Sequence, residues 1–378
     1  MKKSFLLSLF VLIAGFAMGQ ALSGPPSGDN QKSKVIQWIG PVEVSIAYSS
    51  PDVHGPNGED RTGKIWGTPI AHYGFVDQGF GAGIPAPWRA GANENTVIKF
   101  SNDVKIEGKD LKAGTYGLFL AVGKDGAPWT WVFSKNSSSW GSYFYNPSED
   151  VLRVDVNAKD GSYTENLTYG FDDRKANSAS AFLQWENKKI SFKIEVPNVN
   201  DLWVAKMRDD LRSSPGFDPR NFSAAALFCA NNKFNLDEAL TWADKAMDPI
   251  IGGTTDFNAL QAKAAVLNAQ GKGQESGQVM DKAIRLPGVG VQQIHQYGRL
   301  LLNGGFKDKA MEVFQFNAKS HPEEKFTPNV GLARGYTALG DKKNAIKYWQ
   351  LAIANIPENQ KNNKGLYEAE LKKLQEGK

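Results

Sequence analysis

Side chains capable of acid–base or ligand-binding chemistry gather in one long segment rich in Gly and Pro, residues 50–95. It holds two of the four histidines, His54 and His72, and the carboxylates of Glu59 and Glu94. Imidazole and carboxylate groups are the usual general acids and bases of hydrolases. One hypothesis is therefore a hydrolase of envelope or extracellular material that uses these four side chains. In the alternative, which the residue types favour, the carboxylates cap turns and form salt bridges inside the loop.

A second set of side chains in this segment could bind a small polar or glycan ligand. Between Trp88 and Asn95, a cation, two amides and a carboxylate precede a predicted strand. Arg89 could hold a ligand carboxylate or sugar hydroxyls, with an indole ring as a stacking platform. Alternatively, Arg89 pairs with Glu94 and anchors the loop, which we favour because so long a loop needs anchors. The predicted ligand-binding residues are Arg61, Trp66, Trp88, Arg89, Asn93 and Glu94.

Other chemistries lack the motifs that they need. His54 and His72, with nearby aspartates, are the only candidates for a metal cluster, and no HExxH-like spacing accompanies them. The sequence has no Gly-x-Ser-x-Gly elbow, and the Gly-rich run 79–83 lacks the Lys-Ser/Thr pair of a P-loop. We therefore predict no metal and no cofactor, and we favour a binding protein over an enzyme.

Length, net charge and cysteine content limit the class of protein to which these side chains belong. A chain of 378 residues is longer than one average core, so two domains are expected. The net charge of +4 is too small to indicate a nucleic-acid partner. The single Cys, Cys229, excludes an intrachain disulfide and lies in an apolar run typical of a buried position.

The first half has the pattern of an antiparallel β-sandwich-like domain, residues 35–200, after a flexible leader at 20–34. Short segments in which apolar and polar residues alternate, or in which all residues are apolar, lie between residues typical of turns. No helical period separates these segments. Hairpin turns are predicted at 124–126, 159–161 and 186–189, the first two on Asp-Gly pairs. The predicted strands are residues 42–49, 96–101, 103–107, 115–122, 129–134, 151–157, 163–170, 181–186 and 189–196.

The second half changes to a helical period. A connecting segment at 201–219 is followed by a predicted series of helix pairs. Small residues at 239, 276, 310 and 345 lie near the start of the second helix of each pair, at intervals of 37, 34 and 35 residues. Gly-rich or polar turns precede them, and the predicted array, residues 220–378, ends in a polar capping helix at 364–375. Small residues at fixed spacing let paired helices approach closely, which is typical of an α-solenoid.

The N-terminus has the features of an export signal. Lys2 and Lys3 precede an apolar run from Phe5 to Phe16, and Ala17 and Gly19 fit a signal-peptidase site. We predict a signal peptide at 1–19, a periplasmic or extracellular location, and no membrane span after cleavage.

Two resemblances accompany these patterns. The runs KIWGTPIAHYG and PWRAGANENTVIKFSNDVKIEGKDLKAGTYGLFL, with a later LQWE, resemble a family of exported bacterial domains labelled domain of unknown function 2911. That resemblance implies export and a β domain but no established chemistry. The helical units resemble tetratricopeptide repeats, which implies a groove that holds a protein or peptide partner; packing of the repeats on the β domain is an equal alternative. The leading functional hypothesis is an exported, non-enzymatic binding or scaffold protein.

Overall fold

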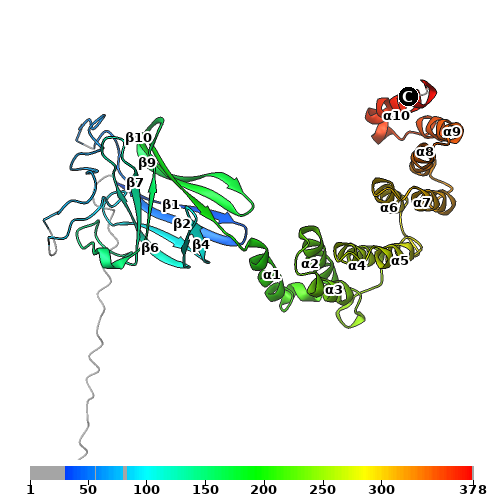
Figure 1. Cartoon of the computed structure of the whole chain (residues 1–378), viewed down its shortest axis with the longest axis horizontal. Helices are drawn as coiled ribbons and strands as arrows, with labels where there is room; N and C mark the ends of the chain where they lie inside the picture. The colour runs from blue at the N-terminus through cyan, green and yellow to red at the C-terminus, as the bar shows by residue number, and fades with distance from the viewer. Residues whose placement is uncertain (1–29, 56, 80–82, 377–378) are drawn as a thin grey trace, which may run out of the picture. The chain divides into compact units, whose positions relative to one another are not determined.

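The computed structural model describes residues 30–55, 57–79 and 83–376 (Figure 1). The chain divides into two compact units, the first ending at Val199 and the second beginning at Asn200. The predicted signal peptide and residues 20–29 of the predicted leader lie outside the described residues. No helix in the described part of the chain combines the length and apolar character that a membrane span requires.

Two antiparallel sheets form the first unit, as the alternating pattern predicted. The larger sheet has the order β1-β2-β3-β6-β7-β8, and the smaller has the order β5-β4-β10-β9. Their strands are β1 (Gln31–Ile39), β2 (Val42–Ser50), β3 (Thr96–Phe100), β4 (Val104–Ile106), β5 (Lys109–Leu111), β6 (Gly114–Ala121), β7 (Trp129–Ser134), β8 (Asp150–Val156), β9 (Lys159–Lys175) and β10 (Ser178–Glu195). A short 3-10 helix, Pro147–Glu149, precedes β8.

Aromatic rings fill the space between the two sheets. Trp131 and Phe133 of β7 meet Phe192 of β10 edge-on, with ring centres 5.3 and 5.5 Å apart. Tyr48 of β2 meets Tyr169 of β9 at 4.8 Å. These side chains are buried, and they alternate with more exposed neighbours along the strands. The sandwich-like class is confirmed by this face-to-face core.

The turns were predicted less well than the sheets. The turn at 124–126 is confirmed: Asp125 and Gly126 both have positive φ, and the Ala127 amide donates to the Lys124 carbonyl oxygen at 2.9 Å. The turns at 159–161 and 186–189 are wrong, because these residues pair with each other inside β9 and β10. The turn of the long hairpin lies instead between Lys175 and Ser178. A β-bulge at Glu186, with φ of 50°, shifts the register between β9 and β10.

Strand β1 corrects the predicted leader. Residues 31–34 belong to this strand, which pairs along its whole length with β2. It lies at the edge of the sheet and is mostly exposed, so its sequence has little of the apolar alternation that marks a strand.

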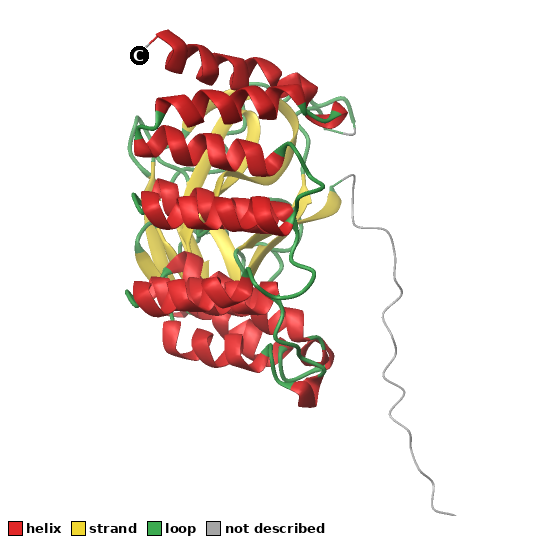
Figure 2. Cartoon of the chain, turned by 90° about the vertical axis from the view of Figure 1, so that its right-hand side faces the viewer, coloured by secondary structure: helices red, strands yellow, loops and turns green. Residues whose placement is uncertain are grey.

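Ten α-helices make up the second unit (Figure 2). After α1 (Val199–Asp210), they form four antiparallel pairs and a last helix. The pairs are α2 (Pro219–Asn232) with α3 (Leu236–Lys245), α4 (Phe257–Ala269) with α5 (Gly273–Ala283), α6 (Val291–Asn303) with α7 (Lys307–Ser320), and α8 (Thr327–Leu339) with α9 (Lys342–Ala354). The last helix is α10 (Lys364–Glu376), and 3-10 turns lie at Ser214–Phe217, Pro249–Ile251 and Glu358–Asn363.

The predicted repeat positions are the contact points of these pairs. Ala239, Ala310 and Ala345 are fully buried, and each lies three residues after the start of its helix. Ser276 takes the same place in α5 and donates a hydrogen bond to the Ala264 carbonyl oxygen of α4 at 2.8 Å. Cys229 is buried in the core of α2 and α3. The α-solenoid of helix pairs is confirmed.

Candidate functional site

In the described parts of the loop, residues 51–55, 57–79 and 83–95, short backbone bridges hold the chain on the sandwich, and no strand is formed. Residue 54 bridges residue 60 within the loop, while Tyr73 and Trp88 bridge Val122 and Leu120 at the end of β6. The amide of Gly63 donates to the buried carboxylate of Glu186 at the β10 bulge. The N–H and C=O groups of an irregular backbone need hydrogen-bond partners. Many polar groups of the loop therefore serve to hold the loop in position.

The predicted indole platform is part of the core. Trp66 lies 5.7 Å from Trp88, 5.0 Å from Trp129 and 5.9 Å from Trp185, and Trp88 stacks on Trp185 at 6.1 Å. Trp88 is only 4% exposed, so its ring faces are covered by protein. The stacking role proposed for Trp88 is therefore wrong for this structure, while Trp66 is half-buried.

His54 forms an exposed cluster with residues of the long strand β9. Its Nδ1 lies 2.9 Å from the Glu165 carboxylate and its Nε2 lies 3.7 Å from Asp60. Tyr163 donates its hydroxyl proton to the same Glu165 carboxylate. Hydrogen bonds from Tyr163 and His54 lower the pKa of Glu165 to about 2, and the bond to Glu165 raises the pKa of His54. The arrangement favours a charged imidazolium, which is a poor general base.

The other predicted catalytic residues do not join this cluster. Glu59 pairs with Arg61 at 2.7 Å, and Arg61 also donates to the Asp52 carbonyl oxygen. His72 is half-buried; its Nδ1 has no hydrogen-bond partner within the described residues, and burial lowers its pKa. Three of the four candidate acids and bases thus pair with three different groups, and no hydrogen bond or ion pair joins His72 to the others.

The favoured Arg89–Glu94 pair is not formed. Arg89 donates to the Asn93 carbonyl oxygen at 2.7 Å, and its guanidinium lies 5.1 Å above the ring of Tyr143. Glu94 instead pairs with Lys32 of β1 at 2.6 Å, and this bond lowers the pKa of Glu94. Lys32 lies within the predicted leader at 20–34, so the sequence pattern does not indicate that this lysine comes close to Glu94.

The Lys32–Glu94 pair lies in the wall of a pocket of about 240 Å³; we call it the polar pocket after this pair, while apolar atoms make up most of its exposed wall. Asn95, which follows Glu94, is buried and is held by a hydrogen bond to the Asn136 carbonyl oxygen at 2.9 Å. Four serines and three residues with apolar surface complete the lining: Ser33, Ser49, Ser137, Ser138, Ala47, Tyr48 and Val97. Charged and hydroxyl groups around so small a volume suit a single sugar or amino-acid unit better than a long chain.

Exposed aromatic side chains gather on two loops of the same unit. Trp140 and Phe144 are 47% and 63% exposed. Phe75 of the long loop contacts Tyr145, with ring centres 6.2 Å apart. The two loops are therefore neighbours, and their rings give the unit an apolar surface that sugars or a partner could cover.

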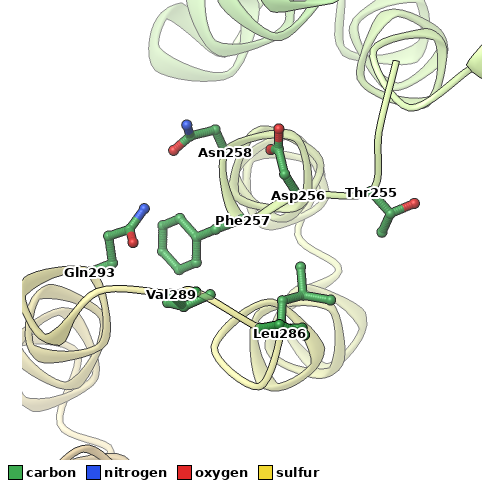
Figure 3. A pocket seen from close by; sticks show the side chains of 9 residues that line it. Thr255, Asp256, Phe257, Asn258, Leu286, Val289 and Gln293 are labelled. Carbon is green, nitrogen blue, oxygen red and sulfur yellow. The ribbon is translucent and has the colours of Figure 1, made fainter. Parts of the chain in front are cut away.

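The second unit has a pocket of about 290 Å³ between α4 and the loop before α6 (Figure 3). Phe257 and Val289 are its buried apolar part. Asn258 and Gln293 line it with polar side chains, and Asp256 caps α4 by accepting from the Ala259 amide at 2.9 Å. Most of these polar groups serve helix capping, which gives the pocket no distinct chemistry.

The sequence of the first unit matches one family model. Residues 30–194 match the model described as "Protein of unknown function (DUF2911)". We call this matched part of the chain the DUF2911 domain. The predicted resemblance is confirmed, and the match covers the sandwich, the long loop and the polar pocket.

Solved structures of MamA are similar to part of the chain. The "Crystal structure of MamA protein" shares 17% identity with a TM-score of 0.31, and the match covers 42% of this chain and 83% of that chain. "MamA 41-end from Desulfovibrio magneticus RS-1" shares 17% identity with a TM-score of 0.29, and covers 42% and 94%. Scores this low carry no conclusion about function. No curated protein matches the sequence.

Several residues around the DUF2911 loop had no signal in the sequence. Lys32 looked like part of a leader, and Glu165 and Tyr163 looked like ordinary polar positions of a strand. Glu165 reaches His54 from 111 residues away, a distance that no local pattern spans. Within residues 30–55, 57–79 and 83–376, no group of three or more His, Cys, Asp or Glu side chains is arranged to hold a metal ion.

Proposed function

We propose that this protein is an exported, non-enzymatic binding or scaffold protein of the bacterial cell envelope. In this proposal the DUF2911 domain binds a small polar ligand beside its long loop, and the helical unit holds a protein or peptide partner. The observation that carries it is the separation of the reactive side chains. His54, Glu59 and Glu94 pair with Glu165, Arg61 and Lys32, and the Nδ1 of His72 has no hydrogen-bond partner among the described residues, so no hydrogen bond or ion pair links the four into a catalytic constellation.

The ligand site that the geometry supports best is the polar pocket at Lys32 and Glu94. The side chains of Lys32 and Glu94 are 60% and 40% exposed, so a ligand in the pocket could reach both, accepting from Lys32 and donating to Glu94. The serine hydroxyls can both donate and accept, which suits hydroxyl-rich ligands. Of the predicted ligand-binding residues, Glu94 lines this pocket, while Arg89 and Asn93 shape the turn before it.

The binding experiment uses an array of neutral sugars, amino sugars and amino acids with the full chain. We expect at least one of them to bind, and Glu94→Gln to weaken that binding about tenfold through loss of one charged hydrogen bond. Glu59→Gln is the matched control, because Glu59 pairs with Arg61 and does not line the pocket. Equal affinity of both variants, or no binding by the wild type, would contradict the proposed site.

Export is supported by the N-terminal pattern alone. Lys2 and Lys3, the apolar run and the small residues before Gln20 fit a cleaved signal. Cell fractionation tests this: the full chain should reach the envelope or the medium with Gln20 as its first residue. A chain that lacks residues 1–19 should stay in the cytoplasm, and retention of both forms there would refute export.

A hydrolase is the second candidate, and the His54–Glu165 contact favours it. A carboxylate that orients an imidazole is a familiar part of hydrolytic sites. His54→Gln, Glu59→Gln and Glu94→Gln distinguish the two functions when assayed on envelope polymers. An enzyme would lose turnover while it stays folded, whereas a binding protein would show changes only in affinity or stability.

A further inference from the structure

The outward face of the edge strand β1 carries a row of long, exposed side chains. Alternate residues of a strand point to the same face, and in β1 the alternate residues from Lys32 to Trp38 are the exposed ones. Two of them are large and apolar: Ile36 is 43% exposed and Trp38 is 57% exposed. The row therefore has a charged end at Lys32 and an apolar end at Trp38, with Lys34 and Ile36 between them.

The charged end of this row lies at the polar pocket. Lys32 is opposite Ser49 of β2, and both residues line the pocket. Lys34 is opposite Ala47, which in turn is opposite Val97 of β3. Ala47 and Val97 also line the pocket. Because residues opposite each other in a sheet share a face, the pocket and the row lie on the same face of the larger sheet.

Beyond the pocket, the row offers both an apolar surface and charged groups. Glu43 of β2 lies opposite Trp38. Glu43 is half-buried and Lys34 is exposed, and within the described part of the chain neither side chain forms an ion pair. At a rise of ~3.3 Å per residue, the strand from Lys32 to Trp38 extends over about 20 Å. This length exceeds that of a single sugar or amino acid.

We infer that this face binds a linear oligosaccharide, with an end unit in the polar pocket and the following units along β1 as far as Trp38. A sugar ring has an apolar face of C–H groups and a rim of hydroxyls, so it fits an exposed indole that is flanked by charged side chains. Lys34 can donate to the hydroxyls and Glu43 can accept from them. The inference rests on the proposed ligand role of the polar pocket, and it adds the class and the length of the ligand.

A second copy of the chain is a less suitable occupant of β1. The free edge of this strand could pair with another strand, but lysines on an edge strand oppose such pairing. Lys32 and Lys34 are both exposed on β1. A sugar chain needs no backbone partner, and its hydroxyls can bond to these lysines instead.

The probes are glucose, N-acetylglucosamine and their linear β-1,4-linked oligomers, titrated into the full chain in a calorimeter. In at least one series we expect the affinity to rise with chain length until the oligomer extends from the pocket to Trp38. Trp38→Ala should weaken the binding of the longest oligomer about tenfold, through loss of the stacked ring, and leave that of the single sugar unchanged. Trp38→Tyr keeps an aromatic ring and should restore most of the loss.

Phe144→Ala is the matched control, because Phe144 is a 63% exposed aromatic residue of the same unit. Its neighbour Tyr145 packs with Phe119 of β6 and Val132 of β7, and strands β2 and β3 separate β6 from β1. This variant should bind every oligomer as the wild type does. Weaker binding in Phe144→Ala but not in Trp38→Ala would place the sugar chain on the aromatic loops and overturn the inference.

Failure of the inference and failure of the proposed pocket give different results. If single units bind and Glu94→Gln weakens them, but longer oligomers bind no better or Trp38→Ala changes nothing, the pocket stands and the inference is refuted. If no single unit binds, the pocket itself fails. Analytical ultracentrifugation tests the other occupant: a dimer that Trp38→Ala dissociates, without any binding of oligomers, would show that β1 joins two copies of the chain.

Discussion

At the scale of single residues, the reactive side chains of the DUF2911 loop act as anchors. His54 ties the loop to Glu165 of β9, Arg61 holds the Asp52 carbonyl, and Arg89 holds the Asn93 carbonyl. A long loop without strands has many backbone groups to satisfy, and charged side chains satisfy them strongly. The sequence pattern marked these residues correctly as important but could not distinguish an anchor from a ligand contact.

The His54–Glu165 pair should make stability depend on pH in two windows. Because the pKa of His54 is raised from 6.5, its stabilising effect is complete below pH 6.5 and is lost as the pH rises through the raised pKa. Because the pKa of Glu165 is lowered from 4.5 to about 2, its effect is present above pH 4.5 and is lost as the pH falls toward 2. We expect His54→Gln to flatten the fall of melting temperature above pH 6.5. Identical pH profiles of variant and wild type would contradict this, and Glu59→Gln serves as the control.

Gly141 tests how tightly Arg89 is held. A Cβ there would lie 2.4 Å from the Arg89 guanidinium carbon, at a φ of +60°. Gly108 has a similar φ of +79° with open space around it, so both alanine variants bear the left-handed strain but only one displaces Arg89. We expect Gly141→Ala to destabilise the fold by about 1 kcal/mol more than Gly108→Ala, through loss of the Asn93 hydrogen bond. Urea unfolding measures the difference, and equal costs would show that Arg89 is not a structural anchor.

At the scale of elements, the repeats depend on helices that approach closely at glycine. The ring of Phe314 on α7 is fully buried against Gly298 of α6 and against Gly331 of α8. These contacts join one helix pair to the next. The regular spacing of small residues in the sequence predicts contacts within a pair but not these contacts between pairs. The strand pattern was less informative, because the edge strand β1 and the bulge at Glu186 hide the usual alternation.

Gly298→Ala should disturb this junction. Its Cβ would lie 2.4 to 2.9 Å from three carbons of the Phe314 ring, which has no room to move in the core. We expect a loss of about 1–3 kcal/mol from overpacking. Gly277→Ala on α5 is the matched control: its Cβ meets nothing within 4 Å, so the variant should gain up to about 1 kcal/mol of helix propensity. Chemical unfolding followed by circular dichroism measures both, and a stabilising Gly298→Ala would contradict the close approach.

At the scale of the whole molecule, the chain consists of two units with separate cores. Aromatic rings between sheets stabilise the first, and alanine, phenylalanine and tryptophan between helices stabilise the second. A core confined to one unit gives that unit its own cooperative transition.

Calorimetry of the full chain should therefore show two transitions. We expect Gly141→Ala to lower only the one that belongs to the DUF2911 domain and Gly298→Ala to lower only the one that belongs to the helical unit. The assignment can be checked by circular dichroism, since loss of helix signal should follow the second transition alone. A single transition shifted by both variants would contradict separate stabilities.

By itself, the sequence determined the two fold classes, most strands, the register of the repeats and the segment with the densest chemistry. Periodicity determines these features, because it reports which face of each element is buried. Only the tertiary structure decided the partners of the charged side chains: Lys32 for Glu94, Glu165 for His54, and the Asn93 carbonyl oxygen for Arg89. The reason is physical. A salt bridge joins groups from distant parts of the chain. Local sequence patterns report only which residues are near in sequence, so they do not show which distant groups come together in the fold.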